Sequence, residues 1–468
     1  MADLTKTEDV YTKKITKVAL LIFCISSLFY CYTFTVQVIP SAISHDLIHD
    51  FVISTTTFGI FSSSFYWLYT SAQIPAGLLI DRFGSRISLT IATFTCGLGT
   101  VIFGLTHSID MAILGRTLEG ISAAFSFTGV IYLIVKWFPP AMLAMFIGLL
   151  QLTASVGAIS GESVIANMLR HYSWRTIITT SGFIGIAIAL IIWLVVKDHP
   201  THRKNNISKN KKLEFGMLQS IYIILSNPQT WYIALFAFCV WGPTLAFAAL
   251  WGIPFLKTSL HISTFHAANT IAIIWIGIGL GSPTIGWLSD KIKRRCLPLI
   301  VTALLGLIAM YCVVYVPHLP RFILYITLFA IGIALSAQTL TFAIVKDNNP
   351  VDIISTANGF NNMAVVLSGV MLQPFIGKLL DMNFHGTIIN GMKIYQPHNY
   401  HIAFSVLPVC FLIAAIIGIF FIKETHCKPA YNIDLIRKKL SNSSNLQPFT
   451  EDLSAIYNIQ HSIKHFYF

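Results

Sequence analysis

Long apolar runs recur through this chain, and they limit the folds that it can adopt. A bilayer core about 30 Å thick requires roughly 20 apolar residues per helix, and a helix satisfies its own backbone hydrogen bonds in hydrocarbon. The runs are too long and too continuous for the alternating strands of an outer-membrane barrel. We therefore expect an all-α membrane protein with twelve transmembrane helices, surrounded by the lipid bilayer. The expected spans lie near residues 18–43, 55–80, 87–106, 110–136, 141–169, 174–196, 229–256, 265–288, 297–317, 321–345, 353–380 and 401–422.

The overall composition supports lipid as the solvent. Hydrophobic residues make up 55% of the 468 residues, which is more apolar surface than a soluble domain of this length could bury in one core. The first seventeen residues are polar, and the run that follows is too long for the core of a signal peptide. We expect this first run to be retained as a helix.

The distribution of positive charge predicts the orientation. If the N-terminus is cytoplasmic, the segments on that side hold 24 of the 31 Lys and Arg residues. Both termini are therefore expected in the cytoplasm, in a multi-pass protein of a bacterial inner membrane. The net charge of +12 is explained by this asymmetry, so we expect no nucleic-acid partner.

The chain divides into two similar halves. A hydrophilic interval from Lys197 to about Gln219 separates six spans from six, and Asp81 and Asp290 follow the second span of each half. Such an internal repeat is typical of transporters that rock two halves about a central site. The tail allows two interpretations, a short amphipathic helix near 431–440 or a weakly ordered segment. The expected parts are an N-terminal segment (1–17), a six-helix bundle (18–196), a linker (197–228), a second six-helix bundle (229–423) and a cytoplasmic tail (424–468).

Each half carries a charged loop after its second span. In "GLLIDRFGSRIS" a glycine permits close helix approach, a carboxylate can neutralise a helix N-terminus, and arginines can pair with acids or lipid headgroups. "GWLSDKIKRRC" repeats this pattern at residues 286–296. Such clusters can hold the cytoplasmic side shut and release it when the halves move. The gating candidates are Gly77, Asp81, Arg82, Gly84, Arg86, Gly286, Asp290 and Arg294.

These loops resemble the signature loop of the major facilitator superfamily, and "LGRTLEGISAA" at 114–124 resembles its fourth-helix motif. The resemblance covers roughly residues 15–425 and implies a twelve-helix secondary transporter that works by alternating access. It further implies that Asp81 and Arg86 stabilise the outward-facing state against the eleventh helix. Stretches such as "FYWLYTSAQIPAG" and "NGFNNMAVVLSGVMLQPFIGKLLD" resemble a bacterial branch that includes phagosomal nutrient transporters of intracellular bacteria. In that branch the first span often carries a carboxylate and an Arg where this chain has Thr33 and Gln37, which weakens the case for a zwitterionic substrate.

Three charges fall within the expected spans. Arg116 and Glu119 are three residues apart on one helix face, and Glu162 lies at a similar depth in the next span. We expect them to form one charged group. In one interpretation a carboxylate of this group takes up a proton that is coupled to substrate. In the other, the three residues clamp the fourth and fifth helices permanently.

Stripes of aromatic and amide side chains predict a binding pocket between the halves. Pockets combine apolar walls with a few polar groups, and the same residues can alternatively pack or hydrogen-bond between helices. The seventh span also contains Pro243 and Pro254, which should loosen its helix. The substrate-binding candidates are Tyr30, Phe34, Gln37, Tyr66, Tyr69, Gln73, Trp241, Trp251, Gln338, Asn358, Asn361, Asn362 and Gln373.

The sequence predicts a secondary active transporter for a small metabolite, of the amino-acid, short-peptide or organic-acid class, with proton-coupled uptake. The partners expected are this metabolite and a proton or another coupling ion, and the chain is expected to be a monomer. We expect no enzyme activity, cofactor or metal, because the sequence holds no phosphate-binding loop, metal-ligand cluster or nucleophile triad. His45 and His49 could form a metal or pH-sensing site, but a solvated loop is the simpler interpretation. The alternatives are efflux of a larger or more apolar compound, and a transporter-like solute sensor.

Overall fold

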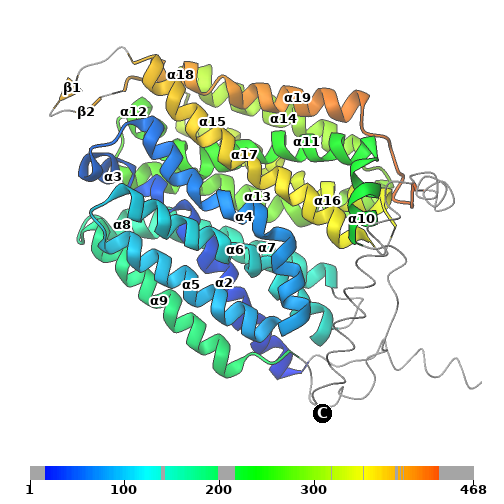
Figure 1. Ribbon diagram of the computed structural model, residues 1–468. Coiled ribbons are helices and arrows are strands. Elements are labelled where there is room, and N and C mark those ends of the chain that lie inside the picture. Colours follow the sequence, from blue (N-terminus) through cyan, green and yellow to red (C-terminus); the bar gives the residue numbers. More distant parts are fainter. Residues whose placement is uncertain are drawn as a thin grey trace, which may run out of the picture.

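The computed structural model describes residues 16–138, 143–198, 217–317, 319–350, 353–384, 388–389, 392–393 and 395–431 (Figure 1). The rest of the expected N-terminal segment, linker and tail, including the possible helix at 431–440, lies outside the described residues. The first half of the chain forms α2 (Lys17–Ala42), α3 (Ser44–Phe51), α4 (Thr55–Phe83), α5 (Ser85–Leu105), α6 (Ile109–Trp137), α7 (Leu143–Ile159), η2 (Ser160–Val164), α8 (Ile165–Met168) and α9 (Trp174–Val195).

The second half repeats this all-helical arrangement and adds a short hairpin. Its elements are α10 (Met217–Leu225), α11 (Pro228–Pro243), η3 (Thr244–Trp251), α12 (Gly252–Leu260), α13 (Thr264–Ile292), α14 (Cys296–Tyr315), α15 (Arg321–Leu335), α16 (Gln338–Asn348), α17 (Ile354–Met382), β1 (Ile388–Ile389), β2 (Met392–Lys393), α18 (Pro397–Ala403) and α19 (Val406–Phe420). β1 and β2 pair antiparallel, with Ile388 opposite Lys393.

Eleven helices of the described chain are long and apolar enough to cross a membrane. The expected span at 55–80 is present as the continuous helix α4, but it is not among the eleven. The sequence of α4 mixes Ser, Thr, Tyr and Gln into the apolar run, which lowers its mean hydropathy. The helix packs against α6 on one face and α17 on another, so these polar side chains can face protein instead of lipid. The interval expected as a polar linker includes the helix α10.

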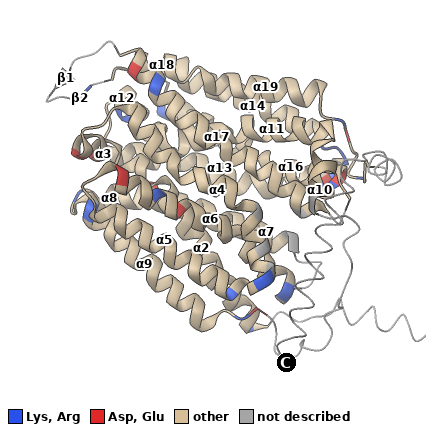
Figure 2. Cartoon of the chain, in the orientation of Figure 1, with Lys and Arg blue, Asp and Glu red and all other residues tan. Residues whose placement is uncertain are grey.

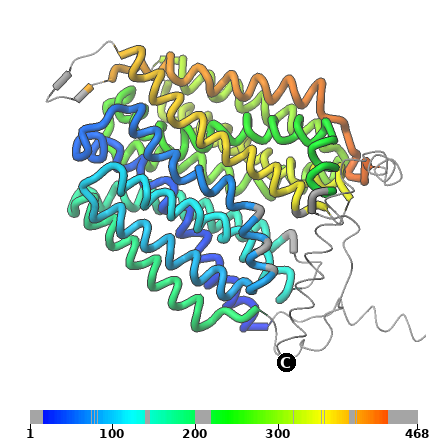
Figure 3. The backbone as a smooth tube through the Cα atoms, viewed as in Figure 1, coloured from blue at the N-terminus to red at the C-terminus, as the bar shows by residue number. Residues whose placement is uncertain are grey.

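The helices gather into two groups that meet along several helix–helix interfaces. Figure 1 shows α2 to α9 packed together, and α11 to α19 forming a second group beside them. The groups touch where α4 meets α17, where α7 and η2 meet α13, and where α2 meets η3. Figure 3 shows α3, α12 and the hairpin at one end of the molecule and the last turn of α19 at the other. Any pathway between the groups therefore runs from the α3 end to the α19 end.

Charged residues avoid the middle of most helices. Figure 2 shows that they gather at the two ends of the molecule, with a few inside the first group near α6. This is the pattern that a membrane requires, because an unpaired charge in hydrocarbon costs several kcal/mol. The exceptions near α6 therefore need partners.

The helices approach one another closely at glycines. A Cβ atom built on Gly120 of α6 would lie 1.7 Å from the backbone oxygen of Phe65, so only glycine permits this crossing of α6 and α4. On α7, a Cβ atom on Gly157 would lie 2.1 Å from the backbone oxygen of Cys31 on α2. These contacts bring the charged face of α6 and the polar face of α2 to the centre of the first group.

In each half, an acidic residue that follows the last helix caps the N-terminus of an earlier helix, α5 in the first half and α14 in the second. The Asp198 carboxylate accepts a hydrogen bond from the backbone N–H of Arg86, at the start of α5. In the second half, Glu424 accepts from the backbone N–H groups of Arg295 and Cys296, at the start of α14. A carboxylate at a helix N-terminus is favoured by both the free N–H groups and the helix dipole. The two halves thus share the same closing contact.

Candidate functional site

Arg116 and Glu119 form a fully buried ion pair on α6. Arg116 Nη1 lies 2.7 Å from Glu119 Oε2, and each side chain is 1% exposed. Arg116 also donates from Nη1 to the backbone oxygen of Val36, at 2.7 Å, and from Nη2 to that of Gln37, at 3.2 Å. Nε has no hydrogen-bond partner among the described residues. The guanidinium group therefore retains at least its Nε–H as a free donor among the described residues.

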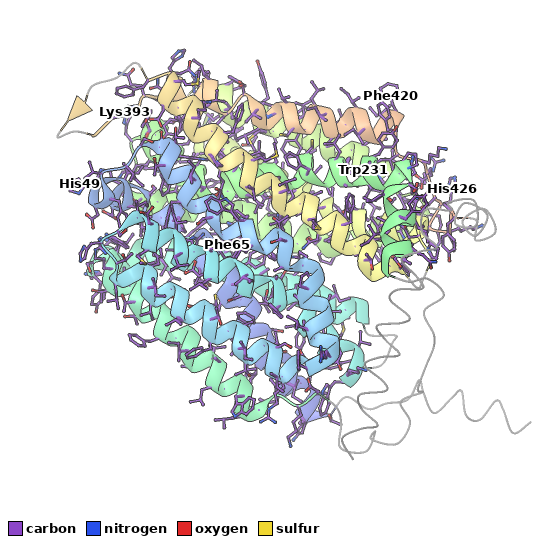
Figure 4. The ribbon with its side chains drawn as sticks, in the orientation of Figure 1. His49, Phe65, Trp231, Lys393, Phe420 and His426 are labelled. Atoms are coloured by element: carbon purple, nitrogen blue, oxygen red, sulfur yellow. The ribbon has the colours of Figure 1, made fainter. Side chains whose placement is uncertain are left out.

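Neighbouring side chains support this pair from three helices. Thr100 of α5 donates to Glu119 Oε1 at 2.7 Å, and the Tyr32 hydroxyl of α2 donates to Thr100 at 3.2 Å. The Phe65 ring of α4, which Figure 4 shows inside the helix bundle, stacks with Arg116 Cζ 5.0 Å from its centroid. The pair therefore links α6 to α2, α4 and α5, rather than clamping α6 to α7 as expected from the sequence.

Glu162 belongs to a separate unit. It lies in the π-helical turn η2, is 0% exposed, and accepts a hydrogen bond at 3.1 Å from the indole Nε1 of Trp275 on α13. Its other oxygen has no hydrogen-bond partner, and it forms no ion pair with Arg116 in the described structure. The widened turn directs Glu162 toward the second group of helices, so the three charges do not form the single group expected from the sequence. π-Helical turns inside helices frequently mark functional positions.

Unsatisfied polar atoms gather beside Arg116. The Tyr66 hydroxyl is buried within reach of the side-chain amides of Gln37 and Gln373, but within the described residues it makes no hydrogen bond of normal geometry. Gln373 Nε2 donates to the backbone oxygen of Leu245 in η3, while its Oε1 has no described partner. Trp251 completes the group by donating to the Gln373 backbone oxygen at 3.1 Å. Four of the predicted pocket residues, from α2, α4, η3 and α17, thus meet beside a guanidinium group.

The other predicted pocket residues fall into smaller sets. Asn361 donates to Thr341 at 2.9 Å, and Tyr69 lies near Gln73 and Asn362. One oxygen each of Asn358 and Asn361 has no partner among the described residues.

On the first helix, Tyr30 donates to Gln151 at 2.8 Å, and Phe34 packs edge-on against Trp275. Trp241 is partly buried and Gln338 is buried, and no side-chain hydrogen bond within the described chain joins either to the rest. The predicted loosening at Pro243 is observed, because η3 begins at the next residue.

Hydrogen bonds close the pathway at the α3 end. Ser41 of α2 donates to the backbone oxygen of Leu250 at 2.9 Å, and Thr55 of α4 donates to that of Gly377 at 3.1 Å. Asp381 at the end of α17 accepts from the backbone N–H of Thr56, at the start of α4, at 2.8 Å. We call these contacts the seal.

Asp381 is a functional candidate that sequence reasoning missed. Besides Thr56, its carboxylate accepts from Lys393 at 2.9 Å and from the Tyr395 hydroxyl at 2.8 Å. The signal available was a lone carboxylate at the end of an expected span, followed by a loop with a lysine. Only the fold shows that a helix N-terminus of the other half lies opposite.

At the opposite end of the pathway, which carries the charged loops, the two groups of helices do not touch at three glycines. Cβ atoms built on Gly77 of α4, Gly148 of α7 and Gly286 of α13 would meet no atom of the described residues within 4 Å. At the sealed end, by contrast, a Cβ atom on Gly59 of α4 would lie 2.6 Å from the backbone oxygen of Gln373. The structure is therefore closed at the α3 end and parted at the end that carries the charged loops.

The first charged loop contacts its own half. Arg86 donates from Nε and Nη2 to the backbone oxygen of Trp193, at 3.0 and 2.7 Å, and stacks on the Trp193 ring of α9. The contact to the eleventh helix implied by the resemblance is therefore absent for Arg86 in this state, because the two groups are parted there. Arg82 stacks on Phe83, and Gly84 adopts φ +83°, a conformation that favours glycine. The Asp81 side chain lies outside the described residues.

In the second loop, Arg295 takes the position expected of Arg294. Arg295 Nη1 lies 2.8 Å from Asp290 Oδ1 and its Nε lies 3.3 Å from Asp347 Oδ2. Arg294 is exposed, and its backbone oxygen accepts from Ser289. The correction has a simple cause, because α13 ends at Ile292 and the left-handed Lys293 turns the following residue outward.

Known proteins resemble this chain over most of its length. A sequence profile described as Major Facilitator Superfamily matches residues 21–374 and 247–447. The chain is 24% identical to a D-galactonate transporter of Escherichia coli O6:H1 over 359 residues, which are 70% of this chain and 82% of that protein. It is 23% identical to a probable galactarate/D-glucarate transporter of Bacillus subtilis over 408 residues, covering 80% of this chain and 87% of the relative.

Other matches are shorter, or concern the fold. An uncharacterized transporter of Bacillus subtilis is 23% identical over 269 residues, and the match spans 53% of this chain and 60% of that relative. Among solved structures, a bacterial homolog of the human lysosomal transporter Spinster, in an inward-facing and unoccupied conformation, superimposes with a TM-score of 0.69. The identity is 18%, and the alignment covers 86% of this chain and 95% of that one. The likeness supports the same helical fold.

Proposed function

Since this chain belongs to the major facilitator superfamily, we propose that it carries a small organic anion of the sugar-acid class by alternating access. It is an integral multi-pass membrane protein and a transporter, as its apolar helices and transporter relatives indicate. The substrate class, coupling ion, orientation and twelve-helix topology are our proposals. The proposed orientation places both termini in the cytoplasm and the sealed α3 end outside, in a bacterial inner membrane.

One observation carries the substrate class. Among the described residues, Arg116 keeps a free Nε–H, and the neighbouring Tyr66 hydroxyl and Gln373 amide oxygen make no hydrogen bond of normal geometry. Buried polar atoms are normally satisfied, so a group of unsatisfied ones between two helix bundles suggests that a ligand binds there. A guanidinium group recognises a carboxylate, while a phenol and amides recognise hydroxyl groups. A polyhydroxy carboxylate supplies both, and relatives are described as D-galactonate and galactarate/D-glucarate transporters.

We assign proton coupling to Glu162. It is buried without a cation partner, so proton uptake removes the cost of an unpaired charge. Glu119, by contrast, already has Arg116 and Thr100 as partners and can stay ionised. Because Trp275 belongs to the other half, protonation of Glu162 changes a contact that must break when the halves move. Proton uptake and the conformational change are thereby linked.

The remaining sequence predictions are refined rather than replaced. The organic-acid class is favoured over amino acids and peptides by the unpaired Nε–H of Arg116 and by the relatives described as sugar-acid transporters. The proposed direction is uptake, and the likeness to phagosomal nutrient transporters is kept as a proposal about its branch.

A ligand screen tests the substrate class. Thermal unfolding of the purified protein would be measured with D-galactonate, D-glucarate, amino acids, dipeptides and the uncharged sugar alcohol galactitol, at pH 5.5 and 7.5. A ligand at 100 times its dissociation constant stabilises by about 2.7 kcal/mol. We expect the sugar acids to stabilise wild type and not Arg116→Gln, and galactitol to have no effect. Stabilisation by dipeptides or amino acids alone would contradict the proposal, and binding without any uptake would indicate a solute sensor.

A further inference from the structure

A large cavity opens above the seal. Its volume is about 1240 Å³, and its floor includes Ala42, Thr55 and Trp251, which lie at or next to the sealing contacts. We call this cavity, lined by α3, the α8 end, α12, the α13 start, the Lys393–Pro397 segment and α18, the vestibule. Figure 4 shows His49 and Lys393, which line it, at one end of the molecule, while His426 lies at the other.

The vestibule carries an excess of positive and titratable side chains. His45 and His49 come from α3, Lys257 from α12, and Arg170 from the segment after α8. His261 and His266 flank the start of α13, and Lys393, Tyr395 and Tyr400 face the cavity from the other side. The one carboxylate in the described lining is Asp46. Three permanent cations and four histidines thus line the cavity with one acid, although Lys393 pairs with Asp381 and His49 Nδ1 lies 3.5 Å from Asp50 Oδ1.

Two nearby acids are already neutralised by other partners. Asp381 is held by Lys393 and Tyr395 in the seal. Asp50 accepts from the Trp174 indole at 2.8 Å and lies 3.7 Å from Arg175. Neither acid offsets Lys257 or Arg170, so the vestibule retains a net positive charge. Clefts of one sign with low-dielectric walls concentrate ions of the opposite sign.

His45 and Lys257 are close enough to influence each other. Burial, the neighbouring Lys257 ammonium group and His49 lower the pKa of His45, although Asp46, which also lies near Lys257, acts in the opposite direction. An anion placed between His45 and Lys257 would offset the Lys257 charge and favour the protonated imidazole. By linkage, protonation of His45 would in turn strengthen the binding of that anion.

We propose that the vestibule binds a small organic anion between His45 and Lys257 before the seal opens, and binds it more tightly as its histidines become protonated. The vestibule is a first site for the substrate, and Arg116 is the second. This inference rests on the transport function and orientation proposed above. It assigns a role to His45 and His49, which lie on the helix α3 and not in the solvated loop expected from the sequence.

The test measures the electrostatic potential of the vestibule through the reactivity of a cysteine placed there, so it does not depend on transport activity. Val52 lines the cavity and is 86% exposed, so Val52→Cys provides a reactive thiol there. Its modification rate would be measured with an anionic and a cationic methanethiosulfonate reagent in the full-length protein, with the chain lacking this substitution as background. The ratio of the two rates cancels the ionisation of the thiol itself.

We expect the anionic reagent to react faster, with a rate ratio that rises from pH 7.5 to 5.5. His45→Gln with Lys257→Gln should lower the ratio about tenfold, and high salt should do the same. Lys423→Gln, which removes an exposed lysine at the opposite end, should leave it unchanged. D-glucarate should slow the anionic reagent, while galactitol should not.

The outcomes separate this inference from the transport proposal. A rate ratio that is unaffected by the double substitution, or no protection by D-glucarate, would overturn the vestibule site even if sugar acids are taken up. A charge-dependent ratio with protection, in a protein that transports no sugar acid, would support the site and refute the transport proposal.

Discussion

Glu162 accepts a hydrogen bond from Trp275, and this 3.1 Å contact joins a buried carboxylate of one half to an indole of the other. In the proposed transport cycle the halves separate here when the seal opens, so the bond would be broken and remade in each cycle. A carboxylate that alternates between this partner and solvent meets two environments with different affinities for a proton. The contact therefore links the ionisation of one residue to the arrangement of the whole molecule.

Glu162→Gln should keep an acceptor for the hydrogen bond from Trp275 but remove the group that binds and releases a proton. We expect this variant to lose accumulation driven by a pH gradient while retaining exchange of labelled for unlabelled substrate. Both would be measured in proteoliposomes. Trp275→Phe keeps the packing on Phe34 and removes the donor, so its rate should depend differently on pH, whereas Trp287→Phe, a matched change at an exposed position, should behave like wild type. Full accumulation by Glu162→Gln would contradict the assignment.

Glu119→Gln should destabilise the protein strongly, although the substitution hardly changes the volume of the side chain. Removing one partner of a buried ion pair leaves an uncompensated charge, at a cost of roughly 3–5 kcal/mol. We expect Arg116→Gln combined with Glu119→Gln to cost less than the sum of the two single changes. Denaturation of the four proteins in detergent gives the coupling energy, and strictly additive losses would show that the pair does not act as a unit.

Asp381→Asn should weaken the seal. Asn cannot form the ion pair with Lys393, and it is a poorer acceptor at the start of α4. We expect a cysteine introduced by Ala42→Cys, at the vestibule floor, to react several-fold faster with a water-soluble thiol reagent in this variant. Asp110→Asn, an acid at the start of α6 outside the seal, is the control. Equal reactivity in both backgrounds would mean that Asp381 does not hold the seal.

Glu424 should make stability depend on acid pH. Burial acts to raise the pKa of Glu424, but the backbone N–H groups of Arg295, Cys296 and His426 outweigh it and hold the pKa below its usual value. A lowered pKa contributes stability that is complete above the unfolded value, about 4.3, and is lost as pH falls through the folded value.

The corresponding variant is Glu424→Gln. Its melting temperature should lie below that of wild type at pH 7 and approach it as pH falls below about 4. Lys423→Gln, the neighbouring change, should show a pH-independent difference. The capping role would be refuted by a Glu424→Gln curve that runs parallel to wild type across this range.

Gly120→Ala should disrupt the crossing of α4 and α6. Its Cβ atom would lie 1.7 Å from the Phe65 backbone oxygen, and overpacking of this kind costs about 1–3 kcal/mol or more. Gly148→Ala, where no atom lies within 4 Å, is the matched control and should be tolerated. Thermal stability in detergent measures both, and equal stability would mean that the helices do not cross so closely.

Sequence reasoning predicted the features that follow from local spacing. The apolar runs correspond to helices, because their length and continuity are set by the bilayer. The Arg116–Glu119 pair was expected, since three residues separate neighbours on a helix face. Pro243 likewise indicated the disturbed helix at η3.

Features that depend on the other half of the fold could not be predicted. The π-helical turn at Ser160–Val164 redirects Glu162 toward Trp275, and nothing in that turn identifies an indole 113 positions away. Asp381 meets the start of α4 only because the halves close at this end. Within the second half itself, Arg295 rather than Arg294 pairs with Asp290 and Asp347, because one left-handed residue follows α13, a detail of the backbone that the charge pattern does not contain.

The central claim is that this protein uses a proton gradient to carry a sugar acid. The most direct measurement is uptake of labelled D-galactonate by proteoliposomes, with and without an inward-directed proton gradient, beside galactitol as the uncharged comparison. We predict accumulation above the equilibrium level only with the gradient, and no accumulation of galactitol. Failure to take up any sugar acid, or uptake that is the same with and without the gradient, would contradict the account.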